Sequence, residues 1–305
     1  MSRRTLAALA AIVGVAVAIT VTLVLITGRK STPKPPIILV HGYALTTGCP
    51  GGDVRLYWSG LTAELVAAGW TNPVVPVSYY ECDRNGTNIA GSSKTDVYFG
   101  APAGTAGSAG YSQNTDLRHL AYVLAWYVYD NYSSNGQTVD LVGHSMGGLM
   151  IRWALSRVAA HDAAFPPYLT VSNVVTISTP YGGAIPAVKN LVACKDSFEC
   201  TQFEAGSAFL TDLAAGPAPS GVDWTAMGGG PCDLMTAASA TDVTPAHHLS
   251  WSQPCYDHSK ILFDDSATFD TTAVFSSPGD PSPTTTQSAP HSLAAVLRAL
   301  QTTSW

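Results

Sequence analysis

The feature that most limits the fold of this chain is a serine between two glycines, in the sequence Gly143-His144-Ser145-Met146-Gly147. A β-branched run (138–142, TVDLV) precedes it, and an apolar run with helical spacing (146–161) follows it. A serine on so sharp a strand-to-helix turn has a strained backbone, and side chains two positions away on either side would collide with the strand and the helix. The pattern predicts a turn that exposes the Ser145 hydroxyl at the carboxyl edge of a sheet. The alternative is a helix start that Ser145 only caps.

The rest of the chain alternates short β-branched runs with amphipathic stretches, which is the pattern of a parallel sheet covered by helices. In the helix expected over 114–131, apolar residues recur every three or four positions, so one face can lie on the sheet. The fold class expected is therefore α/β, with a mostly parallel central sheet and helices on both faces. The other expected strands are 36–40, 74–77, 174–177 and 222–227, and the other expected helices are 58–68 and 292–300. Excursions above the sheet are expected at 86–110 and 180–221, and a loop at 280–287.

The N-terminus carries an uncharged stretch, residues 6–26, with Arg3 and Arg4 before it and Arg29 and Lys30 after it. This length can cross a bilayer as a helix. We expect residues 1–30 to be either a cleaved signal peptide or an uncleaved signal-anchor helix that tethers the protein to a membrane, and the sequence favours neither. Residues 31–36 form a proline-rich spacer, and 37–305 the remaining domain. Both alternatives place that domain outside the cytoplasm, secreted or anchored.

The low content of charged residues also favours an exported protein, and the sign of the net charge disfavours a nucleic acid as partner. Only 12% of the residues are charged, about half the usual share, which is typical of exported proteins. Five of the 15 basic residues lie in the first 34 positions, where there is no acid, so the rest carries ten basic and 21 acidic residues, a formal charge of −11. A protein that binds nucleic acid through its phosphates would need the opposite balance.

All six cysteines follow the apolar segment, and an even number in an exported chain indicates disulfides. Pairing between neighbours along the chain closes local loops, and we expect that arrangement. A metal site is disfavoured because no C-x-x-C or paired histidine spacing accompanies the cysteines. The expected pairs are Cys49 with Cys82, Cys194 with Cys200, and Cys232 with Cys255.

Three stretches of the sequence resemble the α/β-hydrolase superfamily, and within it the bacterial secreted lipases and esterases of the class 2 lipase kind. They are 37–43 (IILVHGY), 139–148 (VDLVGHSMGG) and 179–184 (TPYGGA), so the resemblance covers about residues 36–185. Tyr181 departs from the pattern, because such enzymes commonly have His there. The resemblance implies an α/β-hydrolase fold and a serine nucleophile, Ser145, activated by a later acid and a later histidine.

Backbone amides near the serine are the expected oxyanion donors. His41-Gly42 follows an apolar strand, so the chain leaving the sheet can turn the amide of Tyr43 toward Ser145. The first helical amide, that of Met146, lacks a partner within its helix. The resemblance implies the same two donors, the N–H groups of Tyr43 and Met146. We expect His41 and His144 to be structural neighbours of this turn.

A serine hydroxyl needs a general base, and in this fold the base is a histidine late in the chain. His258, in the sequence YDHSKIL (256–262), resembles the family's ending and is the expected base. His247 and His248 are the alternatives. The other downstream histidines are weaker candidates, one at the far end of the helix that Ser145 begins and one beside the last helix: His161 and His291.

The acid is expected in the loop after the strand at 222–227, where family members place it. Asp233 is the first choice and Asp242 the alternative. Cys232 adjoins Asp233, and Cys255 lies three residues before His258. A bridge between these cysteines would tie the acid loop to the base loop.

Together these residues predict acyl transfer through a Ser145 acyl-enzyme, with no metal or organic cofactor and with an apolar acyl ester or lipid as substrate. An acyltransferase, thioesterase or polyester depolymerase would use the same triad. A non-catalytic envelope binding module on the same scaffold is the alternative from another class. The apolar residues expected either to line an acyl pocket or lid or to belong to the core are Tyr43, Leu45, Leu149, Ile185, Val188, Leu191, Val192, Phe198, Phe203, Phe209 and Leu210.

Overall fold

The computed structural model describes residues 34–43, 52–90, 110–186, 188–190, 194, 197–244, 246–264, 271–278 and 280–302. The chain divides into two units, Met1–Lys34 and Pro35–Trp305. The apolar segment at 6–26 lies outside the described residues. Among the helices that are described, none is both long and apolar enough to cross a membrane.

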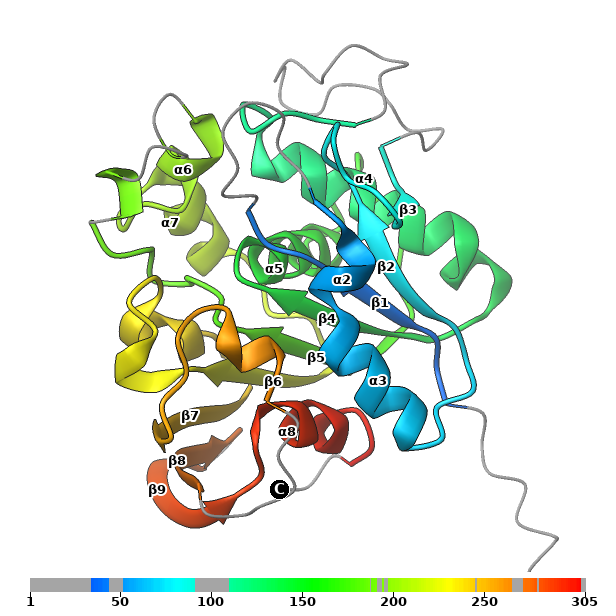
Figure 1. Ribbon diagram of the computed structural model, residues 1–305. Coiled ribbons are helices and arrows are strands. Elements are labelled where there is room, and N and C mark those ends of the chain that lie inside the picture. The colour runs from blue at the N-terminus through cyan, green and yellow to red at the C-terminus, as the bar shows by residue number, and fades with distance from the viewer. Residues whose placement is uncertain are drawn as a thin grey trace, which may run out of the picture. The chain divides into compact units, whose positions relative to one another are not determined.

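The second unit is built on one sheet with the strand order β3-β2-β1-β4-β5-β6-β7-β8-β9 over the described residues (Figure 1). Neighbours from β3 to β7 pair in parallel, whereas β7 with β8 and β8 with β9 pair antiparallel. The expected mostly parallel α/β architecture is confirmed. The strands are β1 (Ile37–Val40), β2 (Val74–Ser78), β3 (Thr87–Asn88), β4 (Val139–His144), β5 (Val171–Ile177), β6 (Asp223–Gly228), β7 (His247–Gln253), β8 (Thr271–Ser277) and β9 (Asp280–Ala289).

Strand β1 shows why the sheet needs helices on both faces. All four of its side chains are fully buried, and because successive side chains point to opposite faces, they join two separate cores. Ile38 and Val40 belong to the core formed with α4 (Leu117–Asn131) and α5 (Met146–Ala159). Ile37 and Leu39 belong to the core formed with α3 (Ser59–Ala67) and α8 (Ser292–Ala299). A continuous apolar run is the pattern of a strand covered on both sides.

The expected helices lie where the apolar spacing predicts them. In α4 the residues at that spacing, Leu117, Leu120, Leu124 and Val128, are all buried. The helix expected over 58–68 is α3, and a short helix that was not expected, α2 (Val54–Tyr57), precedes it, with Trp58 between the two. The segment expected as an excursion at 180–221 holds a 3-10 turn and two short helices: η3 (Val188–Asn190), α6 (Phe198–Gln202) and α7 (Ala208–Ala215). Most of the other expected excursion, 86–110, lies outside the described residues.

The prediction of a loop at 280–287 is wrong, because these residues form β9. Pro281 and Pro283 favoured a loop, but β9 is the last strand of the sheet over the described residues, and its register with β8 is irregular opposite the two prolines. Edge strands and such irregularities tolerate proline. The β-branched run Thr284–Thr286 pairs with β8. Strands β7 and β8 were also not expected. In β7 buried and half-buried residues alternate, a period of two that the polar residues of the strand obscure.

Candidate active site

The serine turn has the strain that its sequence predicts. Ser145 follows β4 directly and begins α5, with φ of 54° and ψ of −128°, angles that an L-residue rarely adopts. A Cβ on Gly147 would lie 2.2 Å from the carbonyl oxygen of Val40 in β1, and a Cβ on Gly143 would lie 2.8 Å from the amide nitrogen of Gly148. The two glycines therefore let the turn pass close to β1 and to the first turn of α5.

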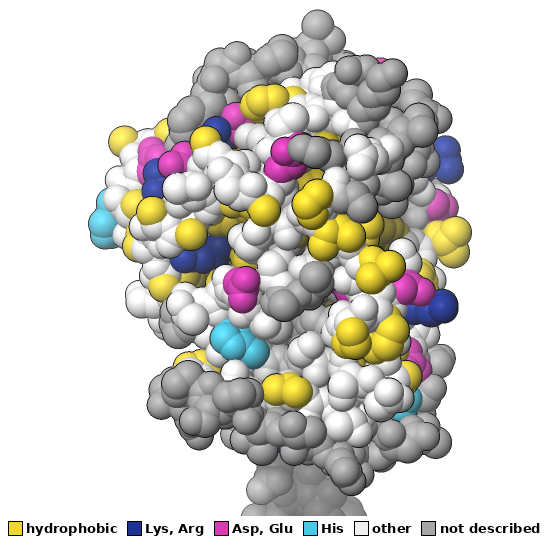
Figure 2. Space-filling view, turned by 90° about the vertical axis from the view of Figure 1, so that its left-hand side faces the viewer, with side chains coloured by type: hydrophobic (Ala, Val, Ile, Leu, Met, Phe, Trp, Pro, Cys, Tyr) yellow, Lys and Arg dark blue, Asp and Glu magenta, His cyan; other side chains and the backbone are white. Residues whose placement is uncertain are grey.

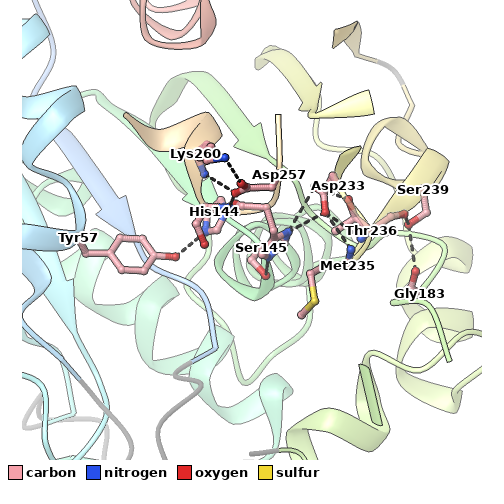
Figure 3. A network of polar contacts seen from close by, with 12 residues as sticks. Tyr57, His144, Ser145, Gly183, Asp233, Met235, Thr236, Ser239, Asp257 and Lys260 are labelled. Atoms are coloured by element: carbon pink, nitrogen blue, oxygen red, sulfur yellow. Dashed lines mark hydrogen bonds and ion pairs between the residues drawn. The ribbon is translucent and has the colours of Figure 1, made fainter. Parts of the chain in front are cut away.

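Two side chains from late loops, those of His258 and Asp233, meet at the serine; Figure 3 labels Ser145 and Asp233. His258 follows β7, and its Nε2 lies 2.9 Å from Ser145 Oγ. Asp233 follows β6, and its two carboxylate oxygens lie 3.1 and 3.3 Å from Nδ1 of the same ring. The structure thus brings together Ser145, His258 and Asp233, three residues that the sequence analysis selected. A carboxylate at Nδ1 leaves Nε2 free to accept the serine proton.

The surroundings of Asp233 keep it ionised. The residue is only 1% exposed, and burial alone would raise its pKa, but the hydrogen bond and charge of His258 and the bond from Thr236 together hold that pKa well below its ordinary value. Asp233 accepts the N–H groups of Met235 and Thr236 at 3.0 and 3.2 Å and the Thr236 hydroxyl at 2.8 Å. The carboxylate is therefore fixed in place as well as charged.

His144 lies beside the base, as expected, but its contacts are more specific than packing. Its Nε2 donates to the backbone carbonyl of His258 at 2.8 Å, and its Nδ1 is hydrogen bonded to the hydroxyl of Tyr57. The ring centres of His144 and His258 are 4.8 Å apart. Burial lowers the pKa of His144 to about 3, with a smaller contribution from the charge of His258, so His144 is neutral near pH 7.

The loop after β1 is held from three directions. His41 Nδ1 donates to the carbonyl oxygen of Gly42 at 2.8 Å, and the Tyr79 hydroxyl donates to the His41 carbonyl at 2.6 Å. His41 Nε2 is hydrogen bonded to the buried carboxylate of Asp83 at 3.0 Å. In a trans peptide the C=O and the next N–H point in opposite directions. Fixing the Gly42 carbonyl therefore also fixes the direction of the Tyr43 N–H.

Gly42 lies against the serine itself, because a Cβ on it would be 2.8 Å from the Ser145 Cβ. The loop with the expected donor Tyr43 thus passes beside the nucleophile, and Met146, the other expected donor, is the first residue of α5. Asp83 and Tyr57 were not identified from the sequence. They lie 42 and 87 positions from the histidines they contact, and no local pattern marks such pairs.

The alternative residues lie elsewhere. His247 contacts Ser277 and Asp223, and His248 contacts the Val243 carbonyl. His291 is the N-cap of α8, and His161 lies beyond the end of α5. Asp242 follows the turn η6 (Ala237–Thr241) directly.

Both disulfides whose cysteines are described match the neighbour pairing. Cys194 is joined to Cys200, and Cys232 to Cys255. The second links the loop of Asp233 to the loop of His258. The pair of Cys49 with Cys82 includes a residue outside the described ranges. Over those ranges no three His, Cys, Asp or Glu side chains are grouped closely enough to hold a metal ion.

A cavity of about 420 Å³ opens over Ser145, and its lining is mainly apolar. On the α6 side it is lined by Ala184, Val188 and Phe203, and on the α2 side by Leu56 and Phe263. Phe203 packs edge-to-face on Tyr43, with ring centres 5.7 Å apart. On the face shown in Figure 2, apolar side chains gather near the middle.

The other expected pocket residues divide among several places. Ile185 lines a smaller cavity of about 120 Å³ beside the first, and Phe198 is 44% exposed. Three of the residues lie outside the described ranges, namely Leu45, Leu191 and Val192. The remaining three belong to the core on the α5 side: Leu149, Phe209 and Leu210.

The buried neutral His144 predicts a loss of stability in acid. Its folded pKa of about 3 lies below the ordinary 6.5, so the unfolded chain binds more protons between these values. The contribution of His144 to the free energy of unfolding is therefore fully present above pH 6.5. It falls as the pH drops toward 3, by up to about 1.4 kcal/mol per pH unit. Urea unfolding of the wild type and His144→Gln between pH 4.5 and 6.5 measures this, and the variant should show the shallower dependence. Equal slopes would show that His144 does not cause it. The titratable groups that face the ring are Tyr57, His258, Asp233 and His41.

Comparison with known proteins gives a match in the segment that contains the serine turn. Residues 108–208 match the family described as "Putative serine esterase (DUF676)". Triacylglycerol lipases of Pseudarthrobacter phenanthrenivorans and Burkholderia plantarii are each 30% identical over 149 residues, which is 49% of this chain. The match spans 34% and 30% of those two proteins, about a third of their length.

Solved structures with similar folds include Aspergillus fumigatus lipase B and the product of gene lin2722 of Listeria innocua. The first is 16% identical, with a TM-score of 0.48 over 75% of this chain and 49% of the lipase. The second is 15% identical, with a TM-score of 0.48 over 88% of this chain and 94% of the other. The fold itself follows from the strand order and from the order Ser145, Asp233, His258 along the chain, which is that of the α/β-hydrolases. The serine turn and the mostly parallel sheet thus give the chain an α/β-hydrolase fold, and the segment around the serine is similar to a serine esterase family and to triacylglycerol lipases.

Proposed function

We propose that the protein is a serine carboxylic ester hydrolase that acts on neutral esters with an apolar acyl chain. The observation that carries this proposal is the contact of His258 Nε2 with Ser145 Oγ at 2.9 Å, with a buried, ionised Asp233 behind the ring. His258 takes the serine proton, and Ser145 attacks the ester carbonyl. The N–H groups of Tyr43 and Met146 bind the oxyanion, and water then releases the acyl group.

The cavity supports an apolar substrate and an orientation for it. His258 must protonate the departing alcohol, and the α2 side of the cavity adjoins the loop of this histidine through Ser259 and Phe263. The acyl chain is then left to the α6 side, against Phe203 and Val188. We also propose that the protein works in an oxidising compartment, since its described cysteines are all paired.

A fluorophosphonate probe and a series of p-nitrophenyl esters test the proposal. The probe should modify Ser145 of the folded protein and not of Ser145→Ala, and the esters should be turned over by the wild type alone. If the folded wild type neither reacts with the probe nor cleaves any ester, the protein is not a serine esterase.

Phe203 is expected to limit the length of the acyl chain. Its side chain lines both the large cavity and the adjoining cavity of about 120 Å³, so Phe203→Ala should join the two. Each further methylene buried contributes about 0.8 kcal/mol, roughly fourfold in kcat/KM. The ester series should show the optimum of the variant moved to longer chains. Phe263→Ala, on the alcohol side, is the matched control and should leave the acyl optimum unchanged. An unmoved optimum in Phe203→Ala would show that the acyl chain lies elsewhere.

A further inference from the structure

We propose that Tyr57 and His144 are positioning residues. They hold the loop of the oxyanion donor Tyr43 and the loop of the base His258 in a fixed position relative to each other. The proposal rests on the proposed esterase function and adds two residues to it. Neither residue touches the reacting atoms in the mechanism above. Both act through the main chain on either side of Ser145.

The connection is a chain of three hydrogen bonds. The Gly42 N–H donates to the Tyr57 hydroxyl oxygen at 3.1 Å. The Tyr57 hydroxyl donates in turn to Nδ1 of His144. At the other ring nitrogen, Nε2 of His144 donates to the His258 carbonyl at 2.8 Å. Figure 3 shows His144 between Tyr57 and the serine.

The direction of each bond is determined by chemistry. A carbonyl oxygen only accepts, so Nε2 of His144 must carry the proton, and in a neutral ring Nδ1 is then an acceptor. The Tyr57 hydroxyl is the donor to it, because burial raises the pKa of this hydroxyl well above its ordinary value. The oxygen of that hydroxyl remains available to the Gly42 amide. Only the tautomer protonated at Nε2 satisfies all three bonds, because the other tautomer has no N–H to donate to the His258 carbonyl.

These three hydrogen bonds join parts of the molecule that local structure does not connect. They span 15, 87 and 114 positions in the sequence. They link the loop after β1, helix α2, the end of β4 and the loop after β7. The main chain of Gly42 sets the Tyr43 amide, and the main chain of His258 sets the position from which its ring reaches Ser145. A shift of the Gly42 main chain is therefore transmitted through the three hydrogen bonds to the main chain of His258, and the reverse.

The first experiment compares the steady-state kinetics of Tyr57→Phe with those of the wild type on one p-nitrophenyl ester. The variant leaves the Gly42 N–H and His144 Nδ1 without this partner, so kcat should fall roughly 10- to 100-fold. Because Tyr57 also lines the cavity, the two kinetic constants must be separated. A fall in kcat at unchanged KM supports positioning. A rise in KM at unchanged kcat, or no change in either, overturns the proposal.

The second experiment uses variants of His144. Glutamine has both an acceptor oxygen and a donor N–H, so His144→Gln should keep kcat within a few-fold, whereas His144→Leu should lose at least as much as Tyr57→Phe. If His144→Leu does not fold, the comparison of Tyr57→Phe with His144→Gln still decides. Tyr181→Phe is the matched control: it also removes a buried hydroxyl, one bonded to Thr176 at 2.9 Å, and kcat should not change.

A spectroscopic readout separates this inference from the proposed function. Long-range ¹⁵N–¹H correlation spectra at pH 7 should show His144 in the wild type protonated at Nε2 only, and in Tyr57→Phe the Nδ1 resonance should shift. This test needs no ester turnover. A wild-type ring protonated at Nδ1 overturns the positioning role, even in an active enzyme. The expected tautomer in a protein without esterase activity would reject the proposed function and leave the hydrogen-bond chain in place.

Discussion

Replacing His258 by alanine is expected to lower kcat for ester hydrolysis by about 10⁴-fold or more, with little change in KM. The imidazole contacts the serine hydroxyl directly, and without it Ser145 has no group to take its proton. Asp233→Asn should have an effect of similar size, because the amide cannot stabilise the imidazolium that forms. Steady-state kinetics on the preferred p-nitrophenyl ester measures both.

The controls for these variants are the residues that the sequence left as alternatives. His248 contacts the Val243 carbonyl, and Asp242 ends η6. His248→Ala and Asp242→Asn should therefore keep kcat within a few-fold. If His248→Ala abolished turnover while His258→Ala preserved it, the assignment of the base would be wrong.

Gly147→Ala is expected to destabilise the fold by about 3 kcal/mol or more. The added methyl would lie 2.2 Å from the carbonyl oxygen of Val40, and this oxygen cannot move far, because β1 is fully buried between two neighbouring strands. Since about 1 kcal/mol lowers Tm by roughly 2–4 °C in a domain of this size, thermal unfolding should show a loss of about 10 °C. Gly52→Ala is the control, because its Cβ would have no heavy atom within 4 Å. Equal Tm values for Gly147→Ala and the wild type would mean that the turn relaxes.

The sequence predicted what local pattern encodes. The turn at Ser145 follows from five adjacent residues, and the buried strand β1 from four. The choice of His258 and Asp233 required the resemblance to a family, because 113 positions separate His258 from the serine that it contacts. No period or composition marks such a pair.

What the sequence missed depends on long-range contacts or on position in the sheet. The partner of His144 is a tyrosine 87 positions earlier, and nothing local distinguishes Tyr57 from the other tyrosines of the chain. Strand β9 was taken for a loop because its two prolines are usual in loops. They are compatible with a strand because β9 is at the edge of the described sheet and its register with β8 is irregular there. Both the order and the register of strands are properties of the whole fold.

That edge has a consequence for the protein in concentrated solution. An uncovered last strand can act as a template on which another molecule adds its own strand, and such addition leads to aggregation. Pro281 and Pro283 supply no amide hydrogen, so a continuous intermolecular ladder along β9 would be interrupted at both positions. The prolines that favoured a loop in the sequence are therefore also unfavourable for strand addition along β9.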